Sequence, residues 1–415
     1  MNDLLWQQPA DMPLGIAKLS KLAFEGTDLG PLRSQLLDKY IFEPNNAAAL
    51  MDLATVEQLF GNEQDGIARQ NEALQCRRIY RSPCAQEKPA LRVLALAAPG
   101  DIGNNTPLEF LLEGSDIALA TLYVVPGSVL PAELPEHDVA IVTACESDDN
   151  RAVLQEIARL LPSWPRPVLN QPDRIATLAR ERLHGVLKTV PGLVAPATVR
   201  IDRTTLGEIA TDRSVLQAHL PDGVFPLIAR PLGSHAGRGL ERLDDEEALG
   251  RYLAARPARG FYISSYIDYR SPDGLFRKYR VVFIGGKPYA CHMAIGDQWM
   301  LYYLNAGMAE SAAKKIEEER FMTRFDYEFG ERHRAALAAI GQRLGLDYFG
   351  IDCAQTAEGK LLLFEADVAM IVHLMDSPVV FPYKAPQMRK LFADFGSLLK
   401  ERALRSPARR LDSVA

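Results

Sequence analysis

Three carboxylates near the end of the chain have the type and spacing that most clearly indicate chemistry. Asp352 interrupts the apolar run FGIDCA, and Glu365 and Asp367 interrupt the apolar run LLLFEADVA. Charged carboxylates inside apolar strands cost free energy unless they are paired with cations or bound to metal. Glu365 and Asp367 are two residues apart and point to one face of a strand, where Asp352 can join them from the neighbouring strand. Three hard oxygen ligands predict a Mg²⁺ site, and a salt-bridge cluster with arginines such as Arg280 is the alternative.

A second stretch that could do chemistry is FPLIARPLGSHAGRGLERL at residues 225–243. An apolar strand ends near Arg230, a loop with three glycines follows, and a second strand-like run comes after it. Glycine lets backbone N–H groups approach phosphate oxygens, and a guanidinium can bind phosphate in a bidentate manner. The stretch therefore predicts a polyphosphate-binding hairpin, and a Gly-rich turn with only a structural role is the alternative.

The elements upstream of these candidates alternate between strands and helices. Three continuous apolar runs, at residues 91–99, 117–125 and 137–144, are typical of strands buried on both faces. Their alternation with helical segments predicts a parallel, doubly wound α/β unit. The first of these strands is followed by GDIGNN and not by GxGxxG, which argues against a dinucleotide site.

The second half of the chain is predicted to be an α+β region built mainly on antiparallel strands. The run FYISSYIDY at residues 261–269 is one strand, and Gly285-Gly286 marks a tight hairpin within residues 277–295. The carboxylate-bearing strands at residues 348–356 and 360–368 are joined by a short AEG turn. The candidate residues thus lie on strands, where their direction is constrained.

Residues 1 to about 85 show helical patterns without the alternation typical of strands. Two amphipathic helices joined at Gly61 resemble a tetratricopeptide repeat, and a helical cap packed on the rest of the chain is the alternative. The predicted domains are a helical module (1–88), an α/β domain (89–185), a two-part domain (186–400, divided near residue 270) and a tail (401–415).

The composition is that of an ordinary soluble protein, with 47% hydrophobic and 24% charged residues. A net charge of −6 with scattered basic residues gives no reason to expect nucleic acid as a partner. Five cysteines without a CxxC pair argue against a disulfide framework and a zinc site, and favour a reducing compartment. Because no signal peptide and no apolar run long enough to span a bilayer are visible, we expect a cytoplasmic protein without membrane contact.

The order of these features resembles that of the ATP-grasp superfamily, which includes D-alanine–D-alanine ligase, glutathione synthetase and the ribosomal S6 modification ligase. The resemblance covers residues from about 90 to 395. It rests on seven motifs in sequence order: VLNQP, VAPAT, PLIARP with GSHAGRG, FYISSYI, KYRVVFIGGKPYA, LNAG, and FGIDCAQTAEGKLLLFEADVAM. It implies an N-terminal α/β domain, followed by a two-part domain that clamps ATP between antiparallel sheets.

Carried over residue by residue, the resemblance implies a nucleotide and metal site. Arg182, or less favourably Lys188, would stand where the first nucleotide-binding lysine is usual, and Arg230 would contact the α- and β-phosphates. Arg280 would stabilise the phosphoryl group in transfer, and the three carboxylates would hold one or two Mg²⁺ ions. The loop over the β- and γ-phosphates and the adenine and ribose segment would supply Ser234, His235, Ala236, Gly237, Ser264, Ser265, Tyr266, Ile267, Asp268 and Asp273.

The implied activity is an ATP- and Mg²⁺-dependent carboxylate–amine ligase that forms an acyl phosphate on an amino acid, peptide or protein. The N-terminal helices would dock a peptide or protein substrate, and a homodimer is left open. Arg182 and Arg230 replace expected lysines, Ser265 replaces an acidic or amide residue, and Asp367 stands where asparagine is commoner. These departures keep two alternatives open: an ATP-binding sensor or scaffold without turnover, and a small-molecule kinase built on the same fold.

Overall fold

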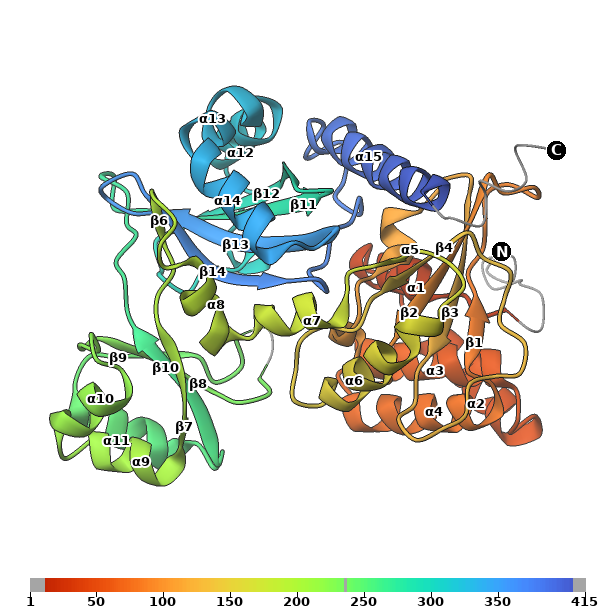
Figure 1. The fold of residues 1–415 in the computed structure, drawn as a ribbon, viewed down its shortest axis with the longest axis horizontal. Helices are drawn as coiled ribbons and strands as arrows, with labels where there is room; N and C mark the ends of the chain where they lie inside the picture. Colours follow the sequence, from red (N-terminus) through yellow and green to blue (C-terminus); the bar gives the residue numbers. More distant parts are fainter. Residues whose placement is uncertain (1–11, 235–236, 406–415) are drawn as a thin grey trace.

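The structure is a computed structural model that describes residues 12–234 and 237–405, and it contains three sheets (Figure 1). The first sheet and the N-terminal helices occupy one end of the molecule, and the second sheet lies at the other end. The predicted loop residues His235 and Ala236 lie outside the described residues, as does the end of the predicted tail. None of the described helices combines the length and apolar character needed to cross a membrane.

The first sheet confirms the predicted parallel α/β unit. Its parallel strands are β2 (Leu91–Ala97), β3 (Ile117–Tyr123), β4 (Val139–Val142) and β5 (Val168–Leu169), in the sheet order β1-β3-β2-β4-β5. The connecting helices are α5 (Leu108–Leu111) and α6 (Arg151–Leu160), and α6 buries Val153, Leu154 and Ile157. Apolar side chains lie on both faces of the central strands, because helices cover both sides.

A short strand, β1 (Ile79–Arg81), extends this sheet and corrects the prediction that the first 85 residues contain no strand. It pairs antiparallel with β3, and its Tyr80 is buried against Tyr123 in an edge-to-face contact. Three residues are too few to show an alternating pattern, so the sequence could not have revealed this strand.

The N-terminal helices pack on the first sheet. They are α1 (Ile16–Phe24), α2 (Gly30–Phe42), α3 (Ala47–Leu59) and α4 (Glu63–Cys76). The carboxamide of Gln58 on α3 accepts a hydrogen bond from the Ile102 N–H at 2.8 Å, and that of Gln70 on α4 accepts one from the Gly100 N–H at 2.7 Å. These bonds attach the helices to the loop after β2. The assignment to a tetratricopeptide repeat stays a prediction.

The second sheet is antiparallel and has its own core. Its strands are β7 (Thr198–Asp202), β8 (Leu227–Pro231), β9 (Glu241–Leu243) and β10 (Gly260–Ser265), in the order β7-β10-β8-β9. Helices α9 (Arg203–Ile209), α10 (Arg213–His219) and α11 (Glu246–Ala255) supply the remaining apolar side chains. Phe261 and Leu249 are completely buried in this core, which is separate from that of the first sheet.

The third sheet carries the candidate carboxylates. Its strands are β11 (Phe276–Ile284), β12 (Lys287–Gly296), β13 (Tyr348–Gln355), β14 (Leu361–Asp367) and β6 (Leu193–Val194), in the order β12-β11-β13-β14-β6. All neighbours are antiparallel except β6, which runs parallel to β14. The predicted hairpin at Gly285-Gly286 is confirmed, with φ values of 57° and 82°. The associated helices are α12 (Ala312–Thr323), α13 (Phe329–Arg332), α14 (Arg334–Leu344) and α15 (Lys384–Leu404).

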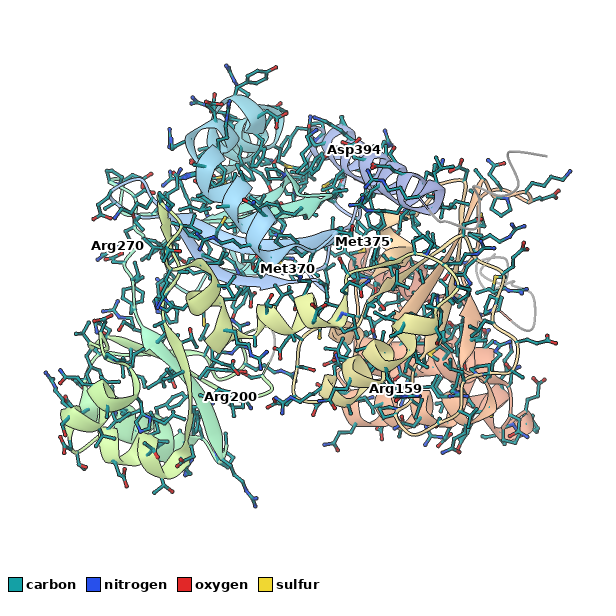
Figure 2. The ribbon with its side chains drawn as sticks, viewed as in Figure 1. Arg159, Arg200, Arg270, Met370, Met375 and Asp394 are labelled. Atoms are coloured by element: carbon teal, nitrogen blue, oxygen red, sulfur yellow. The ribbon has the colours of Figure 1, made fainter. Side chains whose placement is uncertain are left out.

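The first and third sheets share one apolar core, and a buried asparagine joins them. Asn170, in the VLNQP motif after β5, has a φ of 53° and is fully buried. The side-chain carbonyl oxygen of Asn170 accepts hydrogen bonds from the backbone N–H groups of Asp347 and Tyr348, each at 3.0 Å. Its side-chain NH₂ donates to the Tyr348 carbonyl at 2.8 Å. Figure 2 shows Met370 and Met375 at this junction, beyond the end of β14. The carboxylate-bearing hairpin is thereby held against the α/β unit. Two short elements, α7 (Pro172–Ile175) and α8 (Arg180–Leu187), follow the junction.

A buried carboxylate fastens the start of the described chain to α3. Asp52 is 6% exposed, and it accepts hydrogen bonds from the N–H groups of Leu14 at 2.8 Å and Gly15 at 3.2 Å. Burial raises the pKa of Asp52 from 3.8 to about 7, and the two backbone bonds only partly oppose this rise. The folded state therefore favours the protonated form of this side chain.

We predict that Asp52 makes the stability of the protein fall as the pH rises. The pKa of Asp52 is higher in the folded protein than in the unfolded chain. Its stabilising contribution to the free energy of unfolding is therefore fully present below about pH 4 and is lost as the pH rises through about 7. Asp52→Asn should therefore flatten the dependence of the melting temperature on pH between 5 and 8, whereas the exposed control Asp65→Asn should not. Parallel pH profiles for Asp52→Asn and the wild type would contradict this assignment.

Candidate functional site

The β13–β14 pair brings two of the three predicted carboxylates side by side. Asp352 is opposite Glu365 in the antiparallel register, and Gly350 is opposite Asp367. Glu365 and Asp367 are two residues apart on β14, as the sequence predicted, and a register irregularity follows Asp352 on β13. Asp352 is 1% exposed, whereas Glu365 and Asp367 are partly accessible. The apolar strands thus place the carboxylates next to one another, with different degrees of burial.

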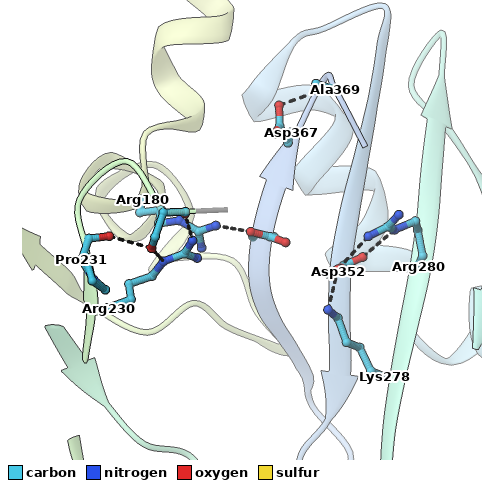
Figure 3. A network of polar contacts seen from close by, with 10 residues as sticks. Arg180, Arg230, Pro231, Lys278, Arg280, Asp352, Asp367 and Ala369 are labelled. Carbon is cyan, nitrogen blue, oxygen red and sulfur yellow. Dashed lines mark hydrogen bonds and ion pairs between the residues drawn. The ribbon is translucent and has the colours of Figure 1, made fainter. Parts of the chain in front are cut away.

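Asp352 is compensated by two cations from β11. The guanidinium of Arg280, opposite Asp352 in the register, donates to both carboxylate oxygens at 2.8 and 3.0 Å (Figure 3). The ammonium of Lys278 lies 2.7 Å from the same carboxylate. Burial would raise the pKa of Asp352, but the charges of Arg280 and Lys278 outweigh it and hold that pKa well below its usual range. The salt-bridge alternative therefore describes Asp352 in this structure.

Glu365 pairs with a cation from outside the third sheet. Arg180, the first residue of α8, donates a hydrogen bond to Glu365, and the second guanidinium on that side belongs to Arg230 of β8 (Figure 3). Burial and the neighbouring charge of Arg180 lower the pKa of Arg230 to about 10. Burial would raise the pKa of Glu365, but the charge of Arg180 helps to lower it. Two guanidinium groups thus face one carboxylate.

The structure places Arg182 away from this cluster. Its side chain is exposed, and one of its N–H groups donates to the Ala176 carbonyl at 3.4 Å. Arg180 and Arg182 are two residues apart on α8 and point in different directions, because a helix turns about 100° per residue. The same run, ATLARER, therefore contains the cation that faces Glu365, but at Arg180.

The predicted loop follows Arg230 directly, and the predicted adenine segment begins on β10, next to β8, where Ser264 is opposite Ile228. Arg230 donates to the hydroxyl of Ser234 at 3.3 Å and also to its carbonyl, and Gly237 has a φ of 68°. Ser264 and Ser265 end β10, next to β8 in the second sheet, and the Ser265 hydroxyl accepts from the Val224 N–H at 3.1 Å.

The residues after β10 have partners of their own. The ring of Tyr266 lies against Arg242 at 4.5 Å, and Ile267 packs at the edge of the main core. The predicted ribose ligands are both ion-paired, Asp268 with Arg270 and Asp273 with Arg277. A nucleotide contact by either carboxylate stays a prediction.

Two of the three predicted carboxylates, Glu365 and Asp367, are partly accessible to a hard metal ion such as Mg²⁺, whereas Asp352 is paired with cations. Among residues 12–234 and 237–405, no three His, Cys, Asp or Glu side chains are grouped to hold a metal. Asp352 does not complete the expected triad, because Arg280 and Lys278 already occupy its oxygens. Burial, together with the charge of Glu365, raises the pKa of Asp367 to about 6, and its contact with the Ala369 N–H at 3.0 Å only partly offsets this. Glu365 and Asp367 remain the candidate ligands of Mg²⁺, which needs few protein ligands, although Arg180 pairs with Glu365 in this structure. Such a site stays a prediction.

Three residues of this cluster were missed by sequence reasoning. Lys278 is two residues before Arg280 on β11, so the alternation of a strand would have placed both cations on one face. No feature of the sequence distinguished Arg180 from Arg182 as the cation that would face the carboxylates. Tyr302 follows β12, and its ring lies 5.9 Å from the Lys278 ammonium.

Comparisons with known proteins found similar solved structures but no related sequence. The sequence matches no protein-family profile and no curated protein. Among solved structures, the chain is similar to a RimK-domain ATP-grasp protein from Sphaerobacter thermophilus, with 17% identity, a TM-score of 0.40, and coverage of 73% of this chain and 98% of that one. It is also similar to the VanG D-Ala:D-Ser ligase from Enterococcus faecalis, with 12% identity, a TM-score of 0.46, and coverage of 76% and 100%. A D-alanine–D-alanine ligase from Bacillus anthracis complexed with ATP is similar as well, with 12% identity, a TM-score of 0.46, and coverage of 76% of this chain and 98% of that one.

We predict that Asp352→Asn destabilises the protein by about 3–5 kcal/mol, because it leaves Lys278 and Arg280 without their buried counter-charge. Glu358→Gln is a matched control, since Glu358 lies exposed in the turn of the same hairpin and should leave the stability nearly unchanged. Denaturant unfolding of the two variants measures the difference. Equal stability of the two variants would mean that the carboxylate of Asp352 is not the centre of this cluster.

Proposed function

We propose that the protein is an ATP-dependent ligase of the ATP-grasp type, which joins a carboxylate to an amine through an acyl phosphate. The observation that carries the proposal is the gathering of four cations between two antiparallel sheets. Arg180 and Arg230 lie on one side, and Lys278 and Arg280 lie on the other, with the β13–β14 carboxylates between them (Figure 3). Such a set of cations suits a polyphosphate, which needs dense positive charge in a partly buried site.

Arg180 and Arg230 are the proposed ligands of the nucleotide phosphates. Arg180 pairs with Glu365, and the charge of Glu365 also acts on Arg230, whose pKa is lowered by burial and by repulsion from Arg180. An incoming polyanion would relieve this repulsion. Arg180 also begins α8, so the positive end of a helix dipole adds to the local potential. Arg180 thus replaces Arg182 as the proposed first nucleotide-binding cation.

The proposed reaction needs charge neutralisation and positioning, without a side-chain nucleophile. A substrate carboxylate oxygen attacks the γ-phosphorus, the bond between that phosphorus and the bridging oxygen breaks, and ADP leaves. The amine nitrogen then attacks the acyl carbon, the carbon–oxygen bond to phosphate breaks, and the amine gives up a proton as the amide forms. Arg280 and Lys278, fixed by Asp352, would neutralise the charge that develops on the transferred group.

Glu365 and Asp367 would hold Mg²⁺ together with phosphate oxygens, in line with the raised pKa of Asp367. When bound, the ion would add positive charge beside the β- and γ-phosphates. Asp352 has a different role in this proposal, because it orients Arg280 and Lys278. The proposed substrates are an amino acid, peptide or protein carboxylate and an amine.

The test is a screen of amino acids and peptides with ATP and Mg²⁺, in which ADP release and product mass are measured together. We expect ADP release that requires both a carboxylate and an amine, and a product lighter than their sum by one water. Glu365→Gln should reduce ADP release by about 100-fold or more, and the hairpin control Glu358→Gln should retain it. A phosphate adduct would indicate a kinase, and ATP binding without ADP release under any combination would indicate a sensor or scaffold.

A further inference from the structure

Tyr302 carries a buried hydroxyl group that has no hydrogen-bond partner among the described residues. The residue lies in the segment after β12, where its backbone N–H donates to the Asn305 side chain at 2.9 Å. An unpartnered buried hydroxyl costs free energy, so its presence in a native structure calls for an explanation such as a ligand. The neighbouring Tyr303 differs, because its hydroxyl donates to Glu318 at 3.2 Å. Tyr266 and Tyr348 also carry buried hydroxyls without a partner among the described residues, but of the adjacent pair Tyr302 and Tyr303 it is Tyr302 that lacks one.

The hydroxyl touches the Gly-rich stretch that the sequence singled out as a phosphate-binding hairpin. Gly237 has a φ of 68°, and a Cβ built there would lie 1.2 Å from the Tyr302 hydroxyl oxygen. No side chain fits between them, so the backbone at Gly237 approaches the hydroxyl directly. Glycine is thus required at this position for two reasons, its backbone conformation and the space that the hydroxyl occupies.

The charges around Tyr302 belong to the proposed phosphate site. The Lys278 ammonium lies 5.9 Å from the centre of the tyrosine ring. Burial raises the pKa of Tyr302, although Lys278 and Arg230 partly oppose the rise, and Glu365 adds to it. The hydroxyl is therefore a protonated donor at neutral pH, close to cations from both sheets. A group in this position can donate to an anion that these cations attract.

We propose that Tyr302 donates a hydrogen bond to an oxygen of the terminal phosphate of ATP, and is a phosphate-binding residue of this site. The inference rests on the proposed function. The terminal phosphate is the favoured acceptor because the transferred group would lie beside Lys278 and Arg280, which both pair with Asp352. Glu365, which would hold the metal, lies between these cations and Arg180 (Figure 3). The hydroxyl would then be satisfied only in the ATP complex.

Calorimetric titration of ATP and ADP into the full-length protein tests this assignment. Tyr302→Phe removes only the hydroxyl, and we expect it to bind ATP about 10- to 100-fold more weakly than the wild type. Its affinity for ADP should stay within about threefold, because ADP lacks the acceptor phosphate. Tyr303→Phe removes the neighbouring hydroxyl and should bind both nucleotides like the wild type.

Gly237→Ala provides a second variant, which displaces the hydroxyl without changing the tyrosine. It should also lose affinity for ATP more than for ADP. The inference is overturned if Tyr302→Phe binds ATP within about threefold of the wild type, or if it loses ATP and ADP affinity equally, as a packing role would require. If the wild type binds neither nucleotide, the proposed function fails, and the inference fails with it.

Discussion

The buried carboxylate of Asp352, held between Arg280 and Lys278, is the interaction on which the proposed site depends. A charge that is 1% exposed persists only when cations compensate it, and β11 supplies both of them from one face. The register of β11 with β13 places Arg280 opposite Asp352, so strand pairing positions the guanidinium before any ligand arrives. Preorganised charge of this kind is what phosphoryl transfer requires, because reorganising polar groups during the reaction costs free energy.

The second side of the site is built differently, and its charge is less balanced. Arg180 and Arg230 come from α8 and β8; Arg180 pairs with Glu365, whereas Arg230 donates to Ser234. The second sheet has a separate core, whereas the first and third sheets share one. The cations that would bind nucleotide phosphates are therefore carried partly by a separate structural unit. The cations that would act on the transferred group belong to the body joined by Asn170.

The features that depend on local patterns could be predicted from the sequence. Buried apolar runs revealed the parallel sheet, and Gly285-Gly286 revealed the hairpin. The period of a strand placed Glu365 and Asp367 together. Features set by tertiary packing were missed: β1 is too short to show a pattern, and nothing local distinguishes Arg180 from Arg182. From the sequence, Arg280 was named as an alternative partner of Asp352 but Lys278 was not, because the neighbouring strand β11 supplies the cations that compensate this buried charge.

The central claim is that the cations gathered between the two sheets bind the phosphates of ATP. Calorimetric titration of ATP into Arg180→Ala and Arg182→Ala tests it most directly, because both variants remove an arginine from α8 and only Arg180 faces Glu365. We predict that Arg180→Ala binds ATP at least about tenfold more weakly than the wild type, and that Arg182→Ala binds it equally well. Unchanged affinity in Arg180→Ala, or equal losses in the two variants, would contradict the proposed site.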